Sequence, residues 1–319
     1  MTKPDKKSEI KDSNSGVELE EVKYHTSVLL HECIEGLNIQ PDGVYVDATF
    51  GGGGHSSEIL KKLGKNGRLF AFDQDEDALK NTSADKRLTL IHANFREMKN
   101  FLRLYDALPV NGILADLGVS SWQFDTAERG FSYRFDGPLD MRMNQKGERS
   151  AKEILMKYTA DELQQMFSQY GEVRNSKTLA LSIVNARSVK PLKTIADLKR
   201  IAIENRMGEE HKYLAQVFQA IRIEVNNELE VLKAFLLQTH EMLSTGGRLV
   251  VLTFHSLEDR LVKNLIRNGN LEDEPEKDFF GNYEKKFRPI NKKPIVASDI
   301  EMKVNSRSRS GKLRIAEKI

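Results

Sequence analysis

The chain has 319 residues, of which 39% are hydrophobic and 30% charged, and its formal net charge is +2 at pH 7. This composition is typical of a globular protein and excludes a disordered chain. No apolar run approaches the ~20 residues of a membrane helix. Met1 to Glu20 is polar and lysine-rich, unlike a secretory signal. We therefore expect a cytoplasmic protein with a flexible tail over residues 1–20 and no membrane association.

Cysteine and charge restrict the chemistry further. Cys33 is the only cysteine, which excludes an intrachain disulfide and favours a reducing compartment. The seven histidines show no close ligand spacing, so no metal is expected. The segment from Lys285 to Ile319 carries eleven Lys and Arg against three Asp and Glu. This basic C-terminal segment suits contact with phosphates, although a solvated terminal segment explains the charge equally well.

Four apolar, strand-like runs each end in a polar or glycine-rich turn. They are Gly43–Ala48, Arg68–Asp73, Leu88–Ala93 and Gly112–Asp116. Helical patterns separate the first three, over Ser56–Leu63 and Asp75–Asn81. Strands and helices alternating at this spacing predict βαβ units. The expected fold class is therefore α/β, with a doubly wound, mostly parallel sheet.

The pattern changes after residue 145. No strand signal occurs between Ser150 and Met207, and helix starts are marked by capping-box spacings at Ser150/Glu153 and Thr159/Glu162 and by a weaker one at Thr194/Asp197. We predict an inserted all-helical subdomain over residues 146–212 that binds substrate. It would divide the core into a first part, residues 21–145, and a second part, residues 213–319.

The second part of the core begins with a long amphipathic pattern. Apolar residues keep helical spacing from Leu214 to Leu236, which predicts one helix with a buried face. The pair Gly246-Gly247 is expected to end this helix. The run Arg248–Phe254 then predicts a buried strand.

The turn after the first strand carries the run Gly51-Gly52-Gly53-Gly54. Glycines at a strand's carboxyl end let the backbone approach a ligand closely. Asp73 ends the next strand, where an acid is placed to accept hydrogen bonds from ribose hydroxyls. An NAD site has similar features, but Ser56 stands where the third fingerprint glycine belongs. Together with Asp47 before the turn, the pattern favours S-adenosylmethionine.

The fourth strand ends at Asp116, at the place that faces the transferred methyl group in methyltransferases of this architecture. Amino methyltransferases often carry Asp/Asn-Pro-Pro-Tyr there, whereas this chain reads Asp116-Leu117-Gly118-Val119. The acid is present and the prolines are not. A helix cap or turn acid is an equally good interpretation of Asp116 from the residues alone.

Six longer segments resemble one family. They are NFRE (94–97), DLGVSS (116–121), ERGFSYRFDGPLDMRM (128–143), FQAIRIEVNNEL (218–229), TFHSLEDR (253–260) and SRSGKLR (308–314). In this order they are similar to the RsmH (MraW) family, whose members methylate the exocyclic N4 of a cytosine in 16S rRNA of the small ribosomal subunit. The resemblance implies a Rossmann-like class I methyltransferase fold, S-adenosyl-L-methionine as cofactor, and cytosine 1402 of the decoding centre as target.

The resemblance also implies a set of cofactor-binding residues: Gly53, Gly54, His55, Asp73, Phe95, Asp116 and Gln123. Asp73 would hold the ribose and Phe95 would pack near the adenine. Ordinary structural roles exist for three of them, namely core for Phe95, a loop amide for Gln123 and a helix start for His55. One departure from the family is Lys212-Tyr213-Leu214, where a basic pair is usual, so a phosphate contact there is in doubt.

Two residues are predicted to act on the target. The exocyclic amine of cytosine is a poor nucleophile, so an acceptor at Asp116 would orient it and hold it in line with the methyl group. His255 is a second candidate, for binding the target base, against the alternative of a turn histidine beside a Ser256-x-x-Asp259 cap. Methylation at cytosine C5 usually needs a cysteine nucleophile. Cys33 precedes the cofactor turn and is not placed for that role, so C5 methylation is disfavoured.

A paired base cannot present its amine, so the target must be unpaired or flipped out. Aromatic residues and arginines cluster beside Asp116: Trp122, Phe124, Phe131, Tyr133 and Phe135, with Arg129, Arg134 and Arg142. They suit stacking on an extruded base and holding its phosphates, and the helical insertion would form the opposing wall. The alternative is a loop that its aromatics fold onto the core.

Two other functions fit the same fold. One is an NAD-dependent oxidoreductase, which the imperfect glycine fingerprint disfavours. The other is a non-catalytic ribosome-assembly factor, which the intact Asp47, Asp73 and Asp116 disfavour. The expected partner in either ribosomal interpretation is the 16S rRNA of the small subunit. A homodimer is compatible with the sequence.

Overall fold

The computed structural model describes residues 27–319, so the tail predicted over residues 1–20 lies outside the described residues. Seven strands form one sheet in the order β3-β2-β1-β4-β5-β7-β6. Their bounds are Val44–Asp47 for β1, Arg68–Asp73 for β2, Leu88–His92 for β3, Val110–Asp116 for β4, Leu243–Thr253 for β5, Phe287–Pro289 for β6 and Lys312–Lys318 for β7. Strands β1 to β5 are parallel, and β7 pairs antiparallel with β5 and β6. The predicted parallel sheet is confirmed.

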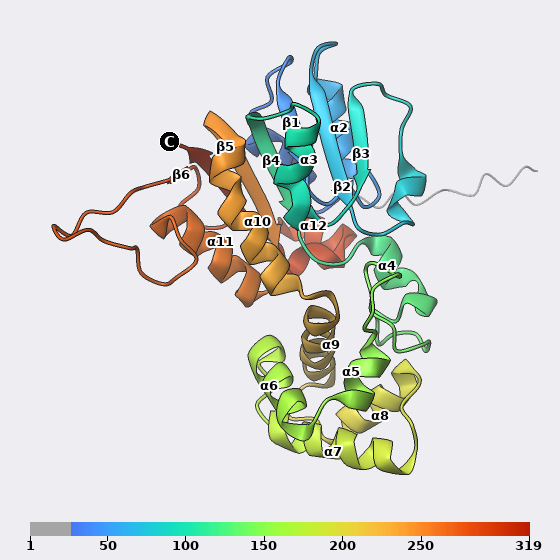
Figure 1. Ribbon diagram of the computed structural model, residues 1–319. Coiled ribbons are helices and arrows are strands. Elements are labelled where there is room, and N and C mark those ends of the chain that lie inside the picture. The colour runs from blue at the N-terminus through green and yellow to red at the C-terminus, as the bar shows by residue number, and fades with distance from the viewer. Residues whose placement is uncertain (1–26) are drawn as a thin grey trace, which may run out of the picture.

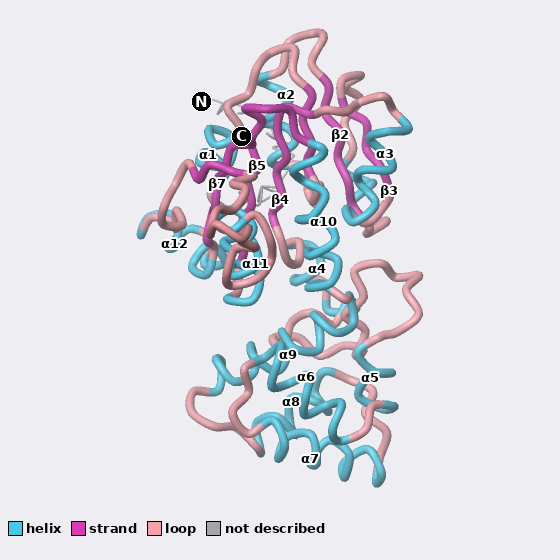
Figure 2. Tube along the Cα trace, turned by 60° about the vertical axis from the view of Figure 1, so that its left-hand side comes forward, coloured by secondary structure: helices cyan, strands magenta, loops and turns pink. Residues whose placement is uncertain are grey.

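Helices cover both faces of this sheet (Figures 1 and 2). One face carries α1 (Leu30–Gly36) and α2 (Gly54–Lys62), and the other carries α3 (Met98–Leu104), α10 (Glu228–Met242) and α11 (Ser256–Asn268). Alternate strand residues point to opposite faces, so Tyr45 packs with the first group and Val46 with the second. Both faces are therefore buried, as in other parallel sheets.

Short elements join these layers. They are α4 (Ser121–Asp125), α12 (Asp299–Val304) and the 3₁₀ turns Ala78–Asn81, Phe95–Glu97, Ala127–Arg129 and Ser306–Ser310. The helix predicted over Asp75–Asn81 is thus only one turn. Within residues 27–319, no helix has the length and apolar character needed to cross a bilayer.

Five helices form a separate unit beneath the carboxyl edge of the sheet (Figures 1 and 2). They are α5 (Ala151–Lys157), α6 (Ala160–Gly171), α7 (Ser176–Val189), α8 (Ile195–Glu204) and α9 (Glu210–Asn226). All three predicted capping boxes are present, at the starts of α5, α6 and α8. Buried residues of α9, such as Val217 and Ile221, belong to the same apolar cluster as Leu163 of α6. The helical unit therefore extends beyond residue 212, where the sequence placed its end.

Two further expectations differ from the structure. The predicted long helix is broken at Asn227, which adopts a left-handed conformation (φ 52°, ψ 37°) and separates α9 from α10. The pair Gly246-Gly247 does not end a helix, because α10 ends at Met242 and both glycines lie within β5. They lie where the register of β5 against β4 shifts, because Val110 pairs with Leu243 but Gly112 pairs with Arg248. The extra residues bulge out of the ladder there.

Candidate active site

A cavity of about 910 Å³ opens at the carboxyl ends of β1, β2 and β4. Its size lies at the upper end of the range of roughly 300–1,000 Å³ found for small-molecule sites. Six of the seven predicted cofactor residues line it: Gly54, His55, Asp73, Phe95, Asp116 and Gln123. Segments far apart in the sequence thus meet where an open α/β sheet binds its ligands.

The glycine run forms the turn between β1 and α2. Gly51 (φ 52°) and Gly53 (φ 76°) both have left-handed backbone conformations, which favour glycine. A Cβ on Gly54 would lie 2.3 Å from the Ser27 hydroxyl oxygen, whereas a Cβ on Gly52 would meet open space. Gly52 lines the cavity and Gly53 does not. Gly53 therefore shapes the turn, and its contact with the cofactor stays a prediction.

Asp47 fixes this turn through two hydrogen bonds. Its side chain is fully buried, with Oδ2 accepting a hydrogen bond from the Ser56 hydroxyl (2.7 Å) and Oδ1 accepting one from the Thr49 backbone N–H (3.1 Å). Burial raises the pKa of Asp47, and both hydrogen bonds favour its ionised form. Asp47 therefore fixes the start of α2 and does not line the cavity.

Asp73 ends β2 and faces the cavity. Its Oδ2 accepts a hydrogen bond from the Gly51 N–H and its Oδ1 accepts one from the Asp75 N–H, both at 2.8 Å. Burial raises the pKa of Asp73 to about 6, so the carboxylate form prevails at neutral pH. Each oxygen keeps a second lone pair, which suits it to accept from ribose hydroxyls. Phe95, beyond β3, packs edge-on against Phe235 (5.2 Å between centroids) and forms another wall.

Gln123 is committed to a buried network. Its Oε1 accepts a hydrogen bond from the Ser120 N–H (3.0 Å), and its Nε2 donates to Asp75 Oδ2 (2.7 Å). Arg129 donates to the same Asp75 oxygen through Nη1 (2.7 Å), with both side chains about 95% buried. Sequence reasoning missed Asp75 and assigned Arg129 to RNA. The structure places Arg129 between the cofactor side of the sheet and the segment that leads to the helical unit.

The Asp116 side chain combines a buried acceptor that lacks a hydrogen-bond partner within residues 27–319 with a raised pKa. It ends β4, and its buried Oδ1 has no hydrogen-bond partner among the described residues. Burial, reinforced by the charges of Asp47 and Glu258, raises the pKa of Asp116 to about 8. Burial also lowers the pKa of His55 to about 4. The 3.8 Å approach of His55 Nδ1 to Asp116 Oδ2 is therefore not an ion pair at neutral pH, because both groups are uncharged.

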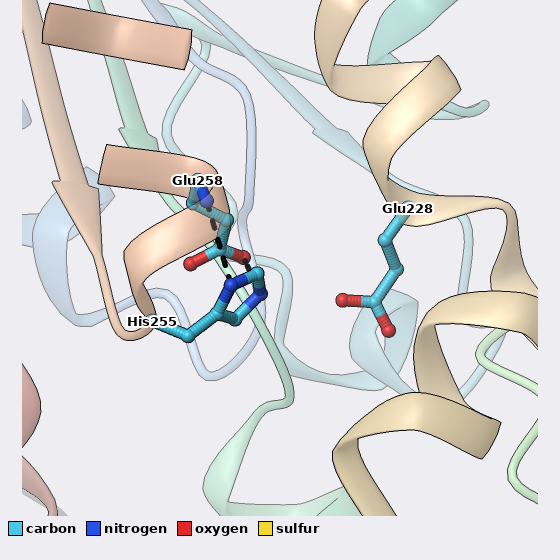
Figure 3. A group of neighbouring side chains, drawn as sticks. All are labelled: Glu228, His255 and Glu258. Carbon is cyan, nitrogen blue, oxygen red and sulfur yellow. Dashed lines mark hydrogen bonds and ion pairs between the residues drawn. The ribbon is translucent and has the colours of Figure 1, made fainter. Parts of the chain in front are cut away.

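His255, the second predicted catalytic residue, is the N-cap of α11. Its Nδ1 accepts a hydrogen bond from the Glu258 backbone N–H (3.4 Å), and its Nε2 lies 3.2 Å from Glu258 Oε1. Figure 3 shows both contacts. His255 does not line the cavity, but Glu258 does. The cap predicted at Ser256 is thus formed one residue earlier, and the side chain that reaches the site is Glu258.

Glu228 faces this pair from the start of α10 (Figure 3). One ligand atom each from Glu228, His255 and Glu258 lie within 4.8 Å of one another, a spacing that could hold a metal ion. Two features argue against a metal ion at this place. Arg222 already binds both oxygens of Glu228, and His255 Nδ1 accepts from an N–H, so a neutral ring carries its proton on Nε2. A metal-bound histidine instead donates through its other nitrogen.

The predicted aromatic and arginine cluster divides into two groups. Phe131 is buried, and Tyr133 packs edge-on against Phe218 (5.5 Å) in the core of the helical unit. Arg142 pairs with Asp140 (2.7 Å). For these residues the alternative role, folding a loop onto the core, agrees with the structure.

The other members remain at the cavity or the surface. Trp122 lines the cavity with 61% of its surface exposed, and Phe124 lines it beside Trp122. Arg134 and Arg307 lie over the Phe124 ring at 5.7 and 5.2 Å. Arg307 comes from the basic C-terminal segment, which thereby returns to the cavity and lines it.

These features define a class of protein. The cavity lies where the sheet places a nucleotide, Asp73 and the Gly51–Gly54 turn suit an adenosine and its tail, and β7 enters antiparallel between β5 and β6. The molecule has the Rossmann-like class I fold of S-adenosylmethionine-dependent methyltransferases.

Comparison with known proteins identifies the family. A family model described as the MraW methylase family matches residues 22–319, so the chain belongs to that family. Relatives from Flavobacterium johnsoniae and Parabacteroides distasonis, both named ribosomal RNA small subunit methyltransferase H, are 56% and 55% identical over 300 and 298 residues. These matches cover 93% of this chain and 99% and 98% of the relatives. A solved putative rRNA methylase from Clostridium thermocellum is 15% identical, covers 92% of this chain and 99% of its own, and has a TM-score of 0.44.

Proposed function

We propose that this protein transfers a methyl group from S-adenosylmethionine to the exocyclic N4 of a cytosine in 16S rRNA of the small ribosomal subunit, at cytosine 1402 of the decoding centre. The observation that carries the proposal is the buried, unpartnered Oδ1 of Asp116 in the cavity at the end of β4. An amine that enters the cavity meets there an acceptor for one of its hydrogens. The names of the relatives support the choice of RNA.

We assign the parts of the cofactor to the walls of the cavity. Asp73 accepts from the ribose, Phe95 borders the adenine, and the open face of Gly52 admits the tail of the molecule. When bound, S-adenosylmethionine supplies a methyl group on a positively charged sulfur. Beside such a charge the pKa of Asp116 falls from about 8, so the carboxylate form becomes favoured when the cofactor is present.

Asp116 then serves the amine in two ways. As a carboxylate it accepts a hydrogen bond from N4 and holds the nitrogen in line for displacement, with ~3 Å between reacting atoms. Transfer of the methyl group would form the new N–C bond and leave the electron pair of the broken C–S bond with the cofactor. The nitrogen then carries the positive charge and loses a proton, which Asp116 accepts. The Asp116 Oδ1 atom itself is buried.

The outer part of the cavity suits a flipped-out nucleotide. Trp122 offers an exposed ring for stacking, and Arg307, which lines the cavity and pairs with Asp125 (2.6 Å), adds a positive charge near it. The helical unit lies opposite, below the same edge of the sheet (Figure 1). We assign it the role of the second wall that receives RNA.

The decisive experiment compares rRNA nucleosides from cells with and without the protein by mass spectrometry. Loss of N4-methylated cytidine from 16S rRNA, and its return on incubating the deficient subunits with purified protein and S-adenosylmethionine, is the expected result. Unchanged N4-methylated cytidine would overturn the cytosine-N4 assignment. Binding of NAD in place of S-adenosylmethionine, measured by calorimetry, would overturn the cofactor assignment.

A further inference from the structure

The order of strands places a second compartment beyond Asp116. Ligand-facing strand ends follow one another as β2, β1, β4 and β5, at about 4.8 Å per strand. Asp73 ends β2 and Asp116 ends β4, while Phe254 and Glu258 follow β5. All four line the same cavity. Glu258 therefore lies on the side of Asp116 that is remote from Asp73, the acid assigned to the ribose, and this side is left for the methyl acceptor.

A buried arginine stands in this compartment. Arg222, in the last turns of α9, donates through Nε and Nη2 to the two oxygens of Glu228, at 2.8 and 2.9 Å. The side chains of Arg222 and Glu228 are only 16% and 10% exposed, and both line the cavity. Within residues 27–319 no hydrogen bond uses Arg222 Nη1. The fork thus fixes the guanidinium plane and leaves one of its nitrogens available to a ligand.

Two carboxylates lie near the Arg222 guanidinium. Glu228 binds it directly, and Glu258 adds a second carboxylate near enough to interact with both Arg222 and Asp116. Three separate elements contribute these groups, α9, α10 and α11, so their convergence is a tertiary feature. An arginine that only covered a helix surface or capped a helix would not need to be buried in the wall of the cavity.

We propose that Arg222 reads the ring of the target base, in a subsite where its Nη1 donates to N3 while Asp116 accepts from N4. This inference rests on the proposed function and names the residue that selects the base. Cytosine presents the ring acceptor N3 beside its amine, whereas uracil presents an N3–H donor at the same position. A guanidinium N–H facing that donor would leave both unsatisfied, which is a strong basis for rejection.

The test uses Arg222→Lys and Arg222→Met, with Arg200→Lys as the matched control. Arg200 is an exposed arginine of the same helical unit that pairs with Glu204. Substrates are small subunits from a strain lacking the protein. Competitors are small subunits in which the target cytosine is replaced by uridine. The readouts are N4-methylcytidine formation, inhibition by the uridine subunits, and S-adenosylmethionine affinity by calorimetry.

Both Arg222 variants are expected to lose at least about 10-fold in kcat/KM. The uridine subunits should inhibit them more strongly, relative to KM, than they inhibit the wild type. Cofactor affinity should change less than about 3-fold, and Arg200→Lys should match the wild type. If Arg222→Met does not fold, Arg222→Lys carries the test, because it keeps the positive charge beside Glu228.

The inference is overturned if a folded Arg222 variant methylates and discriminates as the wild type does. It is also overturned if cofactor binding falls in proportion to methylation while uridine discrimination is unchanged, since Arg222 would then act on the cofactor or the fold. Failure of the proposed function is separable, because in that case the wild-type protein itself forms no N4-methylcytidine.

Discussion

Asp116 combines a buried acceptor with a raised pKa, and its substitution is expected to affect the chemical step. Asp116→Asn keeps the size of the side chain but cannot take a proton. We expect kcat at saturating cofactor and small subunits to fall by roughly 10²- to 10⁴-fold, the usual contribution of a positioned general base. KM for the cofactor should change less than kcat, because the proposed role of Asp116 is toward the amine, whereas the cofactor is assigned mainly to Asp73 and the glycine turn, which line the cavity.

Asp161→Asn is the control for this prediction, since Asp161 is exposed in the first turn of α6. Initial rates of methyl transfer would be compared for the three proteins. A turnover number for Asp116→Asn within about 3-fold of the wild type would remove Asp116 from proton transfer.

The same residue makes stability depend on pH. Its pKa is about 8 in the folded protein and near 3.8 when unfolded, so its stabilising contribution is complete below pH ~4 and is lost as the pH rises towards 8. At 1.36 kcal/mol per pKa unit, the loss is on the order of 5 kcal/mol at most. Asp116→Asn should therefore match the cofactor-free wild type near pH 4 and exceed its stability at pH 8.

Urea unfolding of both proteins across this pH range gives the difference directly. Asp73, whose pKa is also raised, is present in both proteins and cancels in the comparison. Parallel stability curves for the two proteins would show that the pKa of Asp116 is the same in the folded and unfolded protein, which would contradict the prediction.

At the residue scale, sequence reasoning located segments better than side chains. In the segment after β5 the residue predicted to act on the target base is His255, whereas Glu258, three residues later, lines the cavity. The reason is geometric. Which of two neighbouring polar residues caps a helix and which projects into a cavity depends on the angle at which α11 leaves β5, and that angle is set by tertiary packing. Arg222 was hidden for the same reason, inside an apolar helical pattern.

The break between α9 and α10 depends on one residue, Asn227. Its left-handed backbone is tolerated by asparagine and strained for alanine. We expect Asn227→Ala to destabilise the protein by about 1 kcal/mol and to reduce methylation, because a straighter helix would move Arg222 away from Glu228. Asn227→Gly should retain both stability and activity. Urea unfolding and initial rates test this, and equal stability of the alanine and glycine variants would contradict it.

Helix starts and helix breaks differ in how well a sequence reveals them. The three capping boxes were predictable because each is a local contact between residues three apart. The break at Asn227 lies within an apolar pattern that continues through it, so periodicity predicts one helix. Gly246-Gly247 was assigned to a helix end for a similar reason. Only pairing with β4 shows that this pair bulges from β5.

At the scale of the whole molecule, the two units meet at the cavity. The helical unit was predictable from its lack of strand signals, but its true extent was not. Phe131 and Met141, well before residue 146, already belong to its apolar cluster, as does most of α9. Such boundaries depend on which surface each apolar residue is buried against, and periodicity carries no information about that.

Arg129 connects the two units through buried hydrogen bonds. It donates to Asp75 (2.7 Å) and Asp77 (3.1 Å) after β2, and to the backbone carbonyls of Arg142 and Met143 in the segment that leads to α5. Removing one partner of such a pair leaves the other charge buried and unpaired. We therefore expect Arg129→Met to destabilise the protein by about 3–5 kcal/mol and to weaken cofactor binding, because Asp75 donates its backbone N–H to Asp73.

The double variant Asp75→Asn/Arg129→Met measures the coupling between these two side chains apart from their other contacts. If the buried charge left behind causes most of the loss, the double variant should be destabilised by less than the sum of the single ones, with a coupling of about 1–3 kcal/mol. Arg134→Met, whose arginine lies over Phe124 away from this network, serves as the control. Additive effects in urea unfolding would mean that Arg129 acts through the carbonyls of the segment before α5. The coupling between the cofactor edge and the helical unit would then lie in the backbone and not in the ion pair.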